Sequence, residues 1–269
     1  MMEKIKIRFD DKVAETLLIP LWMRARESKR KDALLHDETS ERLVDSIDYD
    51  FEKFSADTKS QVGVALRSRY LDRVVEGFVN SYENPVVVFG GCGLDPRVNR
   101  VKSDKQYIAY ELDLPEVIAY RKELLPATEN DRHLSASLFD TEWMKRLAHD
   151  HEEAQFLFVV EGVLMYFEES IVRKFMCDIS HYFPGSMLYL ERMGSFMAQG
   201  TKYHSSVRNT KATFSWGCDN PEEITSWAPK IKLKEEYYFM KDAPARVGLA
   251  GLIAKYFMWR MCGIWGFHI

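Results

Sequence analysis

The chain of 269 residues lacks the excess of basic side chains that nucleic-acid-binding proteins usually carry. It has 37 Lys and Arg against 41 Asp and Glu, so its formal net charge is −4. Phosphate neutralisation supplies much of the affinity for nucleic acids, and we therefore expect no nucleic-acid partner. The basic run from Arg24 to Lys31 is broken by Glu27, and we interpret it as a solvated helix face.

Cysteine is scarce, and the pattern of metal-binding residues is missing. The four cysteines are widely spaced and form no CxxC motif, which argues against a disulfide framework and against a cysteine-rich zinc site. The seven histidines show no HExxH spacing, and no cluster of Asp and His has the spacing of metal ligands. We therefore expect reduced thiols, a cytoplasmic protein and no bound metal.

Long apolar runs are absent as well. No segment reaches the roughly 20 apolar residues that a membrane-spanning helix needs. The N-terminus is charged and has no apolar core of the kind found in signal peptides. The most apolar stretch, 247–269, is interrupted by Lys255, Arg260 and His268. We interpret it as a buried helix followed by a final strand, with a membrane-surface helix as the alternative, and we expect no membrane partner.

No glycine-rich linker divides the chain. Residues 1–80 have a helical pattern, which is longest at 61–80, and they are predicted to form an N-terminal cap. Residues 81–269 are predicted to form a second unit onto which this cap packs. The two parts together make one structural unit.

The character of the sequence changes at Asn84-Pro85. Five predicted strands follow, at 86–89, 106–112, 133–138, 156–160 and 186–191, and predicted helices separate them at 114–125, 141–149 and 168–183. Two further strands, at 230–240 and 263–269, would bring the total to seven, while a short helix begins after Asn220. The alternation predicts an α/β fold with a mostly parallel sheet and helices on both faces.

A glycine-rich turn follows the first strand, where Val86 to Phe89 run into Gly90, Gly91 and Gly93. Glycine allows a tight turn and a close approach of a ligand to the backbone. Ligands that resemble nucleotides bind at this end of such a sheet. Pro96 stands where a dinucleotide fold has its third glycine, and Asp95 crowds the loop. These two residues favour S-adenosylmethionine, which is cationic and has no phosphate, over a pyrophosphate cofactor.

Acidic residues follow the second and fourth strands. Glu111 lies 20 residues after Gly91, the offset at which an acidic side chain grips ribose in Rossmann-like sites, and Asp113 is two residues further on. Glu161 follows an apolar run, where a carboxylate without partners is costly. It is either a helix cap or surface acid, or a charge that faces the sulfonium or amino group of the ligand.

Three motifs, in this order, resemble the leucine carboxyl methyltransferase family: VVVFGGCGLDPR, YELDLPEVI and VVEGVLMYF. The N-terminal segments TLLIPLWMRARES and IDYDFEKF resemble its bacterial small-molecule branch, the polyketide O-methyltransferases of the tetracenomycin-pathway type. The resemblance covers roughly residues 14–195. It implies a Rossmann-like class I methyltransferase with a seven-stranded sheet, a helical N-terminal cap and S-adenosylmethionine as donor, with S-adenosylhomocysteine as product.

The resemblance also implies roles for residues at the methionine end of the donor. Arg67 would meet the methionine carboxylate, and Glu161 would lie near the same end. Gly91 would pack on the donor through its backbone, with Gly93 in the same loop.

At the adenosine end, the resemblance implies that Asp113 holds the ribose hydroxyls with Glu111 beside it, and that Leu138 flanks the adenine. The family often has an aspartate before this leucine. The present chain has Ser137 there, which accepts a hydrogen bond without a charge, and Asp140 lies close enough in sequence to substitute.

The reaction that we expect is methyl transfer to a carboxylate or hydroxyl of a small molecule, of the polyketide or secondary-metabolite type. A carboxylate is ionised at pH 7 and needs no base, whereas a phenol benefits from one. Tyr166 is placed to line the acceptor side, and His204 and Arg24 are further candidates. A protein C-terminal carboxyl methyltransferase, a non-catalytic donor-binding protein and a nicotinamide-dependent oxidoreductase are alternatives, and the sequence leaves the oligomeric state open.

Overall fold

The computed structural model describes residues 4–7, 14–55, 58–199, 213–242, 247–257 and 259–269. Its strands are β1 Pro85–Gly90, β2 Ile108–Asp113, β3 Asp131–Ser135, β4 Gln155–Val160, β5 Met187–Met193, β6 Lys232–Tyr237 and β7 Cys262–His268. They form a seven-stranded sheet of order β3-β2-β1-β4-β5-β7-β6. Strands β1 to β5 pair in parallel, while β7 is antiparallel to both β5 and β6. The predicted α/β fold is confirmed.

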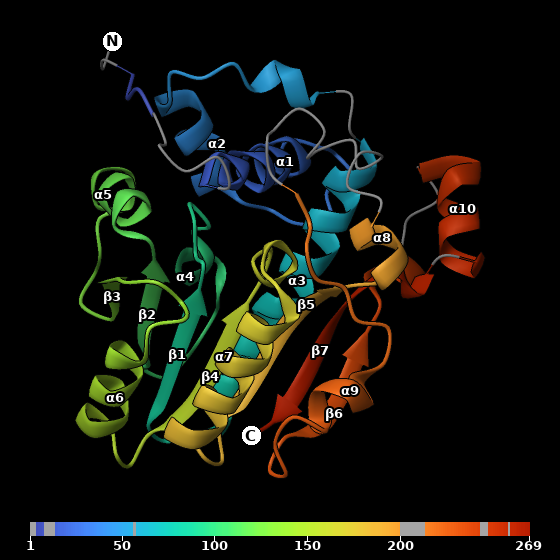
Figure 1. Ribbon diagram of the computed structural model, residues 1–269. Coiled ribbons are helices and arrows are strands. Elements are labelled where there is room, and N and C mark those ends of the chain that lie inside the picture. The colour runs from blue at the N-terminus through green and yellow to red at the C-terminus, as the bar shows by residue number, and fades with distance from the viewer. Residues whose placement is uncertain (1–3, 8–13, 56–57, 200–212, 243–246, 258) are drawn as a thin grey trace.

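Helices cover both faces of this sheet (Figure 1). The longer ones are α1 Leu18–Ser28, α2 Glu38–Ser46, α3 Thr58–Ser81, α5 Pro115–Leu124, α6 Thr141–Asp150, α7 Glu169–Tyr182 and α10 Gly248–Phe257. The shorter ones are α4 Arg97–Arg100, α8 Ser195–Gln199, α9 Pro221–Thr225 and the 3-10 helices η1 Ala14–Leu17, η2 Phe51–Phe54, η3 Leu164–Tyr166, η5 Phe239–Asp242 and η7 Trp259–Met261. In the part of the chain described, no helix is long and apolar enough to cross a membrane.

Alternate residues of β1 explain the two layers. Val86 and Val88 face a core cluster that includes residues of α6, α7 and α9. Val87 and Phe89 face the opposite cluster, to which α3 and α5 contribute. Because successive side chains of a strand point to opposite faces, a run of apolar residues is what a strand buried on both sides requires.

The N-terminal helices lie over the carboxyl ends of the parallel strands (Figure 1). Asp37 is the N-cap of helix α2, and its carboxylate accepts a hydrogen bond from the backbone N–H of Ser40 at 2.8 Å. Leu18 and Leu21 of α1 pack with Leu94 of the loop after β1. The predicted division at residue 80 falls near the end of α3, which contributes residues both to this region and to the core under the sheet.

Candidate functional site

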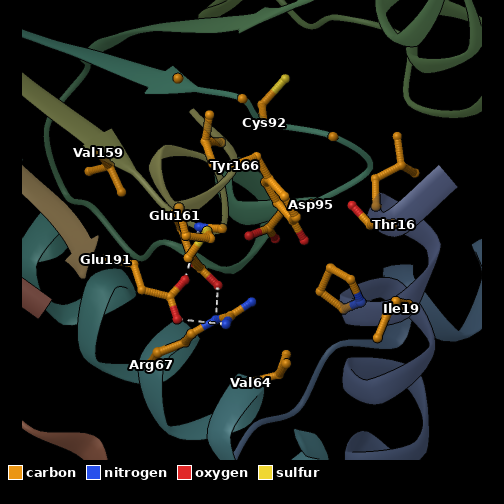
Figure 2. A pocket seen from close by; sticks show the side chains of 18 of the residues that line it. Thr16, Ile19, Val64, Arg67, Cys92, Asp95, Val159, Glu161, Tyr166 and Glu191 are labelled. Carbon is orange, nitrogen blue, oxygen red and sulfur yellow. Dashed lines mark hydrogen bonds and ion pairs between the residues drawn. The ribbon is translucent and has the colours of Figure 1, made fainter. Parts of the chain in front are cut away.

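A cavity of about 700 Å³ lies at the carboxyl ends of the central strands, beneath the N-terminal helices (Figure 2). The structure brings together every predicted site residue that it describes. Its lining includes Arg67, Gly91, Gly93, Glu111, Asp113, Ser137, Leu138, Glu161 and Tyr166. Arg24 lines it as well, whereas the candidate His204 lies outside the described residues.

The glycine loop after β1 takes a shape that side chains would prevent. Gly91 has φ +68° and Gly93 has φ +50°, both in the left-handed region that favours glycine. A Cβ on Gly91 would stand 2.2 Å from the Cγ2 atom of Val163, which follows β4. The Gly91 N–H donates to the carbonyl of Leu112 at 2.8 Å. Bare backbone of this loop therefore forms a wall of the cavity.

Asp113, at the end of β2, is held beneath this loop. Its two carboxylate oxygens accept the backbone N–H groups of Gly93 at 2.7 Å and Leu114 at 2.8 Å. Burial raises the pKa of Asp113, and these two bonds offset only part of that effect. Each carboxylate oxygen retains further acceptor capacity. Asp113 is thus fixed in place and able to accept two hydroxyl groups from a ligand.

Glu111 has a different environment. The buried guanidinium of Arg121 contacts both of its oxygens, with Nε at 2.8 Å from Oε2, and donates to the Gly93 carbonyl at 2.8 Å. Burial acts most strongly and would raise the pKa of Glu111, but Arg121 and His133 together outweigh it and lower that pKa. The geometry therefore favours Asp113 for a hydroxyl pair, with Glu111 anchoring the loop through Arg121. The sequence reasoning missed Arg121, although a buried carboxylate requires such a partner.

Arg67 stands between two carboxylates (Figure 2). Its Nε donates to Glu161 at 2.7 Å and its Nη1 donates to Glu191 at 2.8 Å. The other oxygen of Glu191 accepts the N–H of Gly162 at 2.9 Å. Burial opposes the charge of Arg67, but Glu191 and Glu161 outweigh it and raise the pKa of Arg67. Arg67 is therefore a permanent cation at the floor of the cavity.

Glu191, on β5, is a second residue that sequence reasoning missed. Burial raises its pKa, and Arg67 offsets this only in part. Glu161 differs, since Arg97 and Arg67 together outweigh its burial and lower its pKa. A carboxylate inside the apolar strand Met187–Met193 was the available signal, because such a group is costly unless it is paired.

A second group of arginines joins the N-terminal helices to the glycine loop. Arg100 contacts Asp37 of the α2 N-cap at 2.8 Å, Asp72 of α3 at 2.8 Å and Asp95 of the loop at 2.7 Å. Arg97 contacts Asp72 as well, at 2.9 Å. These buried pairs fix the position of the loop relative to α2 and α3.

Two sequence-based interpretations are corrected by this group. Arg24 is only 2% exposed and lies 3.4 Å from Asp37, so the start of the basic run is not a solvated face, whereas Lys29 to Lys31 are exposed as predicted. Asp37 and Asp95, which are distant in sequence, neutralise the charge of Arg24. Burial acts to raise the pKa of Asp95, but Arg100 and its neighbours outweigh it and lower that pKa. Because arginines balance Asp95, its charge alone does not exclude a pyrophosphate.

The residues predicted from sequence to flank adenine lie after β3 and line the cavity. Leu138 is buried, and its Cδ1 lies 2.7 Å from where a Cβ on Gly90 would stand. The N–H of Ser137 donates to Asp140 at 3.3 Å. Ser137 lines the cavity, whereas Asp140 is not among the described lining residues. The carboxylate of Asp140 thus closes its own turn, and Ser137 is the polar group at this wall.

The opposite wall is apolar and rich in sulfur. Five methionines line it: Met165, Met193, Met197, Met240 and Met261. Tyr166 packs against Phe214 with ring centroids 5.4 Å apart. Burial raises the pKa of Tyr166, so its phenol stays neutral near pH 7. This wall suits a flat apolar molecule, because methionine adapts to irregular shapes and contacts aromatic rings favourably.

Charged side chains form part of the cavity lining. Among the described lining residues, the arginines are Arg24, Arg67 and Arg97, and the carboxylates are Asp95, Glu111, Asp113, Glu161 and Glu191. Arg100 and Arg121 lie behind this lining and pair with Asp95 and Glu111. Among the described lining carboxylates, Asp113 is the one that no arginine contacts within ion-pair distance. The described residues contain no group of His, Cys, Asp and Glu that could hold a metal ion.

Comparisons with known proteins agree with this geometry. The sequence model of the leucine carboxyl methyltransferase family matches residues 18–179. The chain is 30% identical to the tetracenomycin polyketide synthesis O-methyltransferase of Streptomyces glaucescens, over 86% of this chain and 84% of that protein. It is 25% identical to an S-adenosyl-L-methionine-dependent methyltransferase of Gibberella zeae, over 91% and 88%. A methyltransferase structure from Thermobifida fusca shares the fold, with TM-score 0.58, 17% identity and coverage of 96% and 92%.

Proposed function

The chain belongs to the leucine carboxyl methyltransferase family, and from this premise we propose that it methylates an oxygen atom of a small organic molecule. It is an S-adenosylmethionine-dependent methyltransferase. The observation that carries the proposal is Asp113, a carboxylate fixed beside the bare glycine loop by two backbone N–H groups and not bound to an arginine. S-adenosylmethionine presents two ribose hydroxyls, whose hydrogen bonds such a carboxylate can accept.

The residues present fit the donor. Val163 packs where a Cβ on Gly91 would stand, so the glycine loop presents bare backbone to the donor, and Asp113 offers two fixed oxygens for the ribose hydroxyls. Arg67 would bind the methionine carboxylate through the donors that its two ion pairs leave free. Leu138 would cover the adenine. When bound, S-adenosylmethionine supplies a methyl group already activated on sulfur.

The work left to the protein is to align the acceptor and exclude water. Alignment alone contributes about 7–11 kcal/mol in favourable systems. The methionine-rich wall would hold a flat apolar acceptor, and Tyr166 would donate a hydrogen bond to its oxygen because its phenol stays protonated.

A carboxylate acceptor fits this site better than a phenol. Glu161 and Glu191 are both held in ion pairs with Arg67, so neither is free to approach a phenol and take its proton. A carboxylate arrives ionised and needs no base. The relative from Streptomyces glaucescens acts in polyketide synthesis, and by analogy we propose an aromatic acid of that class for this chain.

We further propose that the protein acts in the cytoplasm. Cys92, Cys177, Cys218 and Cys262 are all free thiols, which is the usual state in reducing compartments.

A direct test is a methylation assay with isotopically labelled S-adenosylmethionine and matched pairs of aromatic acids and phenols, with product detection by mass spectrometry. The proposal expects methyl esters from the acids. For an acid, kcat/KM should be nearly constant between about pH 6 and pH 9, since the acceptor stays ionised. Methyl ethers formed only from phenols, at a rate that rises with pH, would overturn the choice of acceptor. Absence of donor binding by calorimetry would overturn the donor site itself.

A further inference from the structure

Helix α10 carries an apolar stripe on its outer side. Four large side chains are exposed there: Leu249 by 74%, Leu252 by 52%, Ile253 by 45% and Tyr256 by 66%. They follow the spacing i, i+3, i+4 and i+7, which places them on one face of the helix. The interpretation of this segment as a buried helix is therefore wrong, although the final strand β7 is confirmed. Surface helices usually turn such a stripe toward a core.

The position of α10 leaves this stripe uncovered by the described parts of the chain. The helix contacts η5 and η7 at the edge of the molecule, away from the central strands (Figure 1). The large hydrophobic side chains exposed elsewhere in the described residues are Ile171 and Phe196. Four of six thus gather on one short helix, which points to a binding surface.

Basic and aromatic side chains surround the base of α10. The Nζ atom of Lys241 lies 3.6 Å from the ring centroid of Trp259, and the guanidinium carbon of Arg260 lies 4.7 Å from it. Lys255 is half-buried beside the stripe. Tryptophan, tyrosine and basic residues around an apolar stripe are the composition of helices that lie in a membrane interface.

The local charge has the sign that such a surface requires. The described residues of 239–261 contain three basic residues and one acidic residue, a net charge of +2 in a chain whose total is −4. The acidic residue is Asp242, which accepts a hydrogen bond from the Tyr237 hydroxyl at 2.7 Å. An anionic lipid surface complements both the apolar stripe and this local positive charge.

The same segment also forms part of the cavity. Met240 of η5, Val247 before α10 and Met261 of η7 line its methionine-rich wall. A molecule bound at the outer face of α10 therefore lies next to the elements that would hold the acceptor. Apolar aromatic compounds partition into bilayers, so a surface here would give the acceptor a short path to the site.

We propose that the outer side of α10 and the adjoining η5 and η7 dock on an anionic bilayer surface. This α10 surface consists of the stripe Leu249, Leu252, Ile253 and Tyr256, together with Trp259, Lys241, Lys255 and Arg260. The contact in this arrangement is peripheral, with no described helix crossing the bilayer. The proposal departs from the sequence-based expectation of no membrane partner. It stands apart from the proposed function, because it depends on the α10 surface and not on the acceptor or the donor residues.

The test is co-sedimentation of the full chain with vesicles, in low and high salt. One set is phosphatidylcholine alone, and the other contains about one third phosphatidylglycerol, so that surface charge is the variable. We expect binding to the anionic vesicles only, weakened by high salt. The variant Leu252→Ser/Ile253→Ser should bind at least about tenfold less, since each apolar side chain loses a large part of its transfer free energy.

Matched variants separate the stripe from general effects. Ile171→Ser removes an exposed apolar side chain of α7 and should bind vesicles as the unchanged protein does. Lys241→Glu/Arg260→Glu should lose binding to anionic vesicles. Each variant should keep its affinity for S-adenosylhomocysteine, which shows that it is folded and separates this test from that of the donor site. The proposal would be overturned if the unchanged protein did not bind vesicles, or if the Leu252→Ser/Ile253→Ser variant bound them equally well. It would also be overturned if sedimentation velocity showed a dimer that this variant abolishes, while vesicles bound neither the unchanged protein nor the variant.

Discussion

Replacing Gly91 by alanine perturbs the loop in two ways that can be separated. The left-handed conformation at φ +68° costs an L-residue about 1–2 kcal/mol. The new Cβ would also stand 2.2 Å from Val163 Cγ2, and overpacking of this kind costs about 1–3 kcal/mol. The loss in free energy of unfolding should therefore be roughly 2–5 kcal/mol.

Gly185 provides the matched control. It has φ +86° in the turn before β5, and a Cβ there would meet nothing within 4 Å. Gly185→Ala should therefore lose only the conformational part, about 1–2 kcal/mol. Each kcal/mol corresponds to about 2–4 °C in melting temperature for a chain of this size. A double variant, Gly91→Ala/Val163→Ala, should recover part of the steric loss.

The assay combines thermal unfolding with calorimetric titration by S-adenosylhomocysteine. Gly185→Ala should bind the ligand as the unchanged protein does, and Gly91→Ala should bind at least about tenfold more weakly, because loop backbone that is displaced loses its fit to the donor. The reasoning is refuted if Gly91→Ala is no less stable than Gly185→Ala and binds with unchanged affinity.

Three further predictions concern the charged groups. Arg121→Met leaves Glu111 buried without its arginine partner and should lower the free energy of unfolding by about 3–5 kcal/mol at neutral pH. The lowered pKa of Glu111 stabilises the unchanged protein fully only when the pH is above the ordinary pKa of a glutamate. Denaturant unfolding should therefore show the difference in free energy of unfolding shrinking in acid. Asp113→Asn should weaken S-adenosylhomocysteine binding roughly 10- to 100-fold. Since the pKa of Asp113 is raised and the hydroxyls would bind its ionised form, calorimetry should show affinity falling as pH is lowered through that pKa in the unchanged protein and less so in the variant. Arg67→Lys keeps a charge but cannot bridge two carboxylates, and titration should show at least about tenfold weaker binding, with unchanged affinity counting against its role.

The sheet and the site were predictable because they depend on local patterns. Apolar runs such as Phe156–Val160 are short and bounded by turns, and parallel strands bring their carboxyl ends to one edge. The glycine loop and the acidic residues after β2 and β4 therefore met at one cavity, as predicted. Residues that follow neighbouring strands are brought together by topology alone.

What the sequence could not supply were partners distant along the chain. Arg24 is buried because Asp37 and Asp95 reach it through the fold, whereas its sequence neighbours are charged and suggest solvent. The exposure of the stripe on α10 could not be predicted for the same reason, since periodicity predicts an apolar face but not what covers it. Arg121 and Glu191 escaped notice because each is explained only by the group that it contacts.

Helix α3 determines where relatives of this protein could be recombined. Arg67 lies on the same continuous helix as Leu71, Val75 and Phe78, which pack beneath the sheet. A chimera joined at residue 80 would take its N-terminal segment, including the residue at position 67, from the relative. That residue would then lie in a foreign register relative to the sheet of this chain. A junction just before Thr58 exchanges η1 and α1, which contribute to the cavity wall, and leaves the arginine on its native helix. Libraries that seek new acceptors should therefore be spliced there.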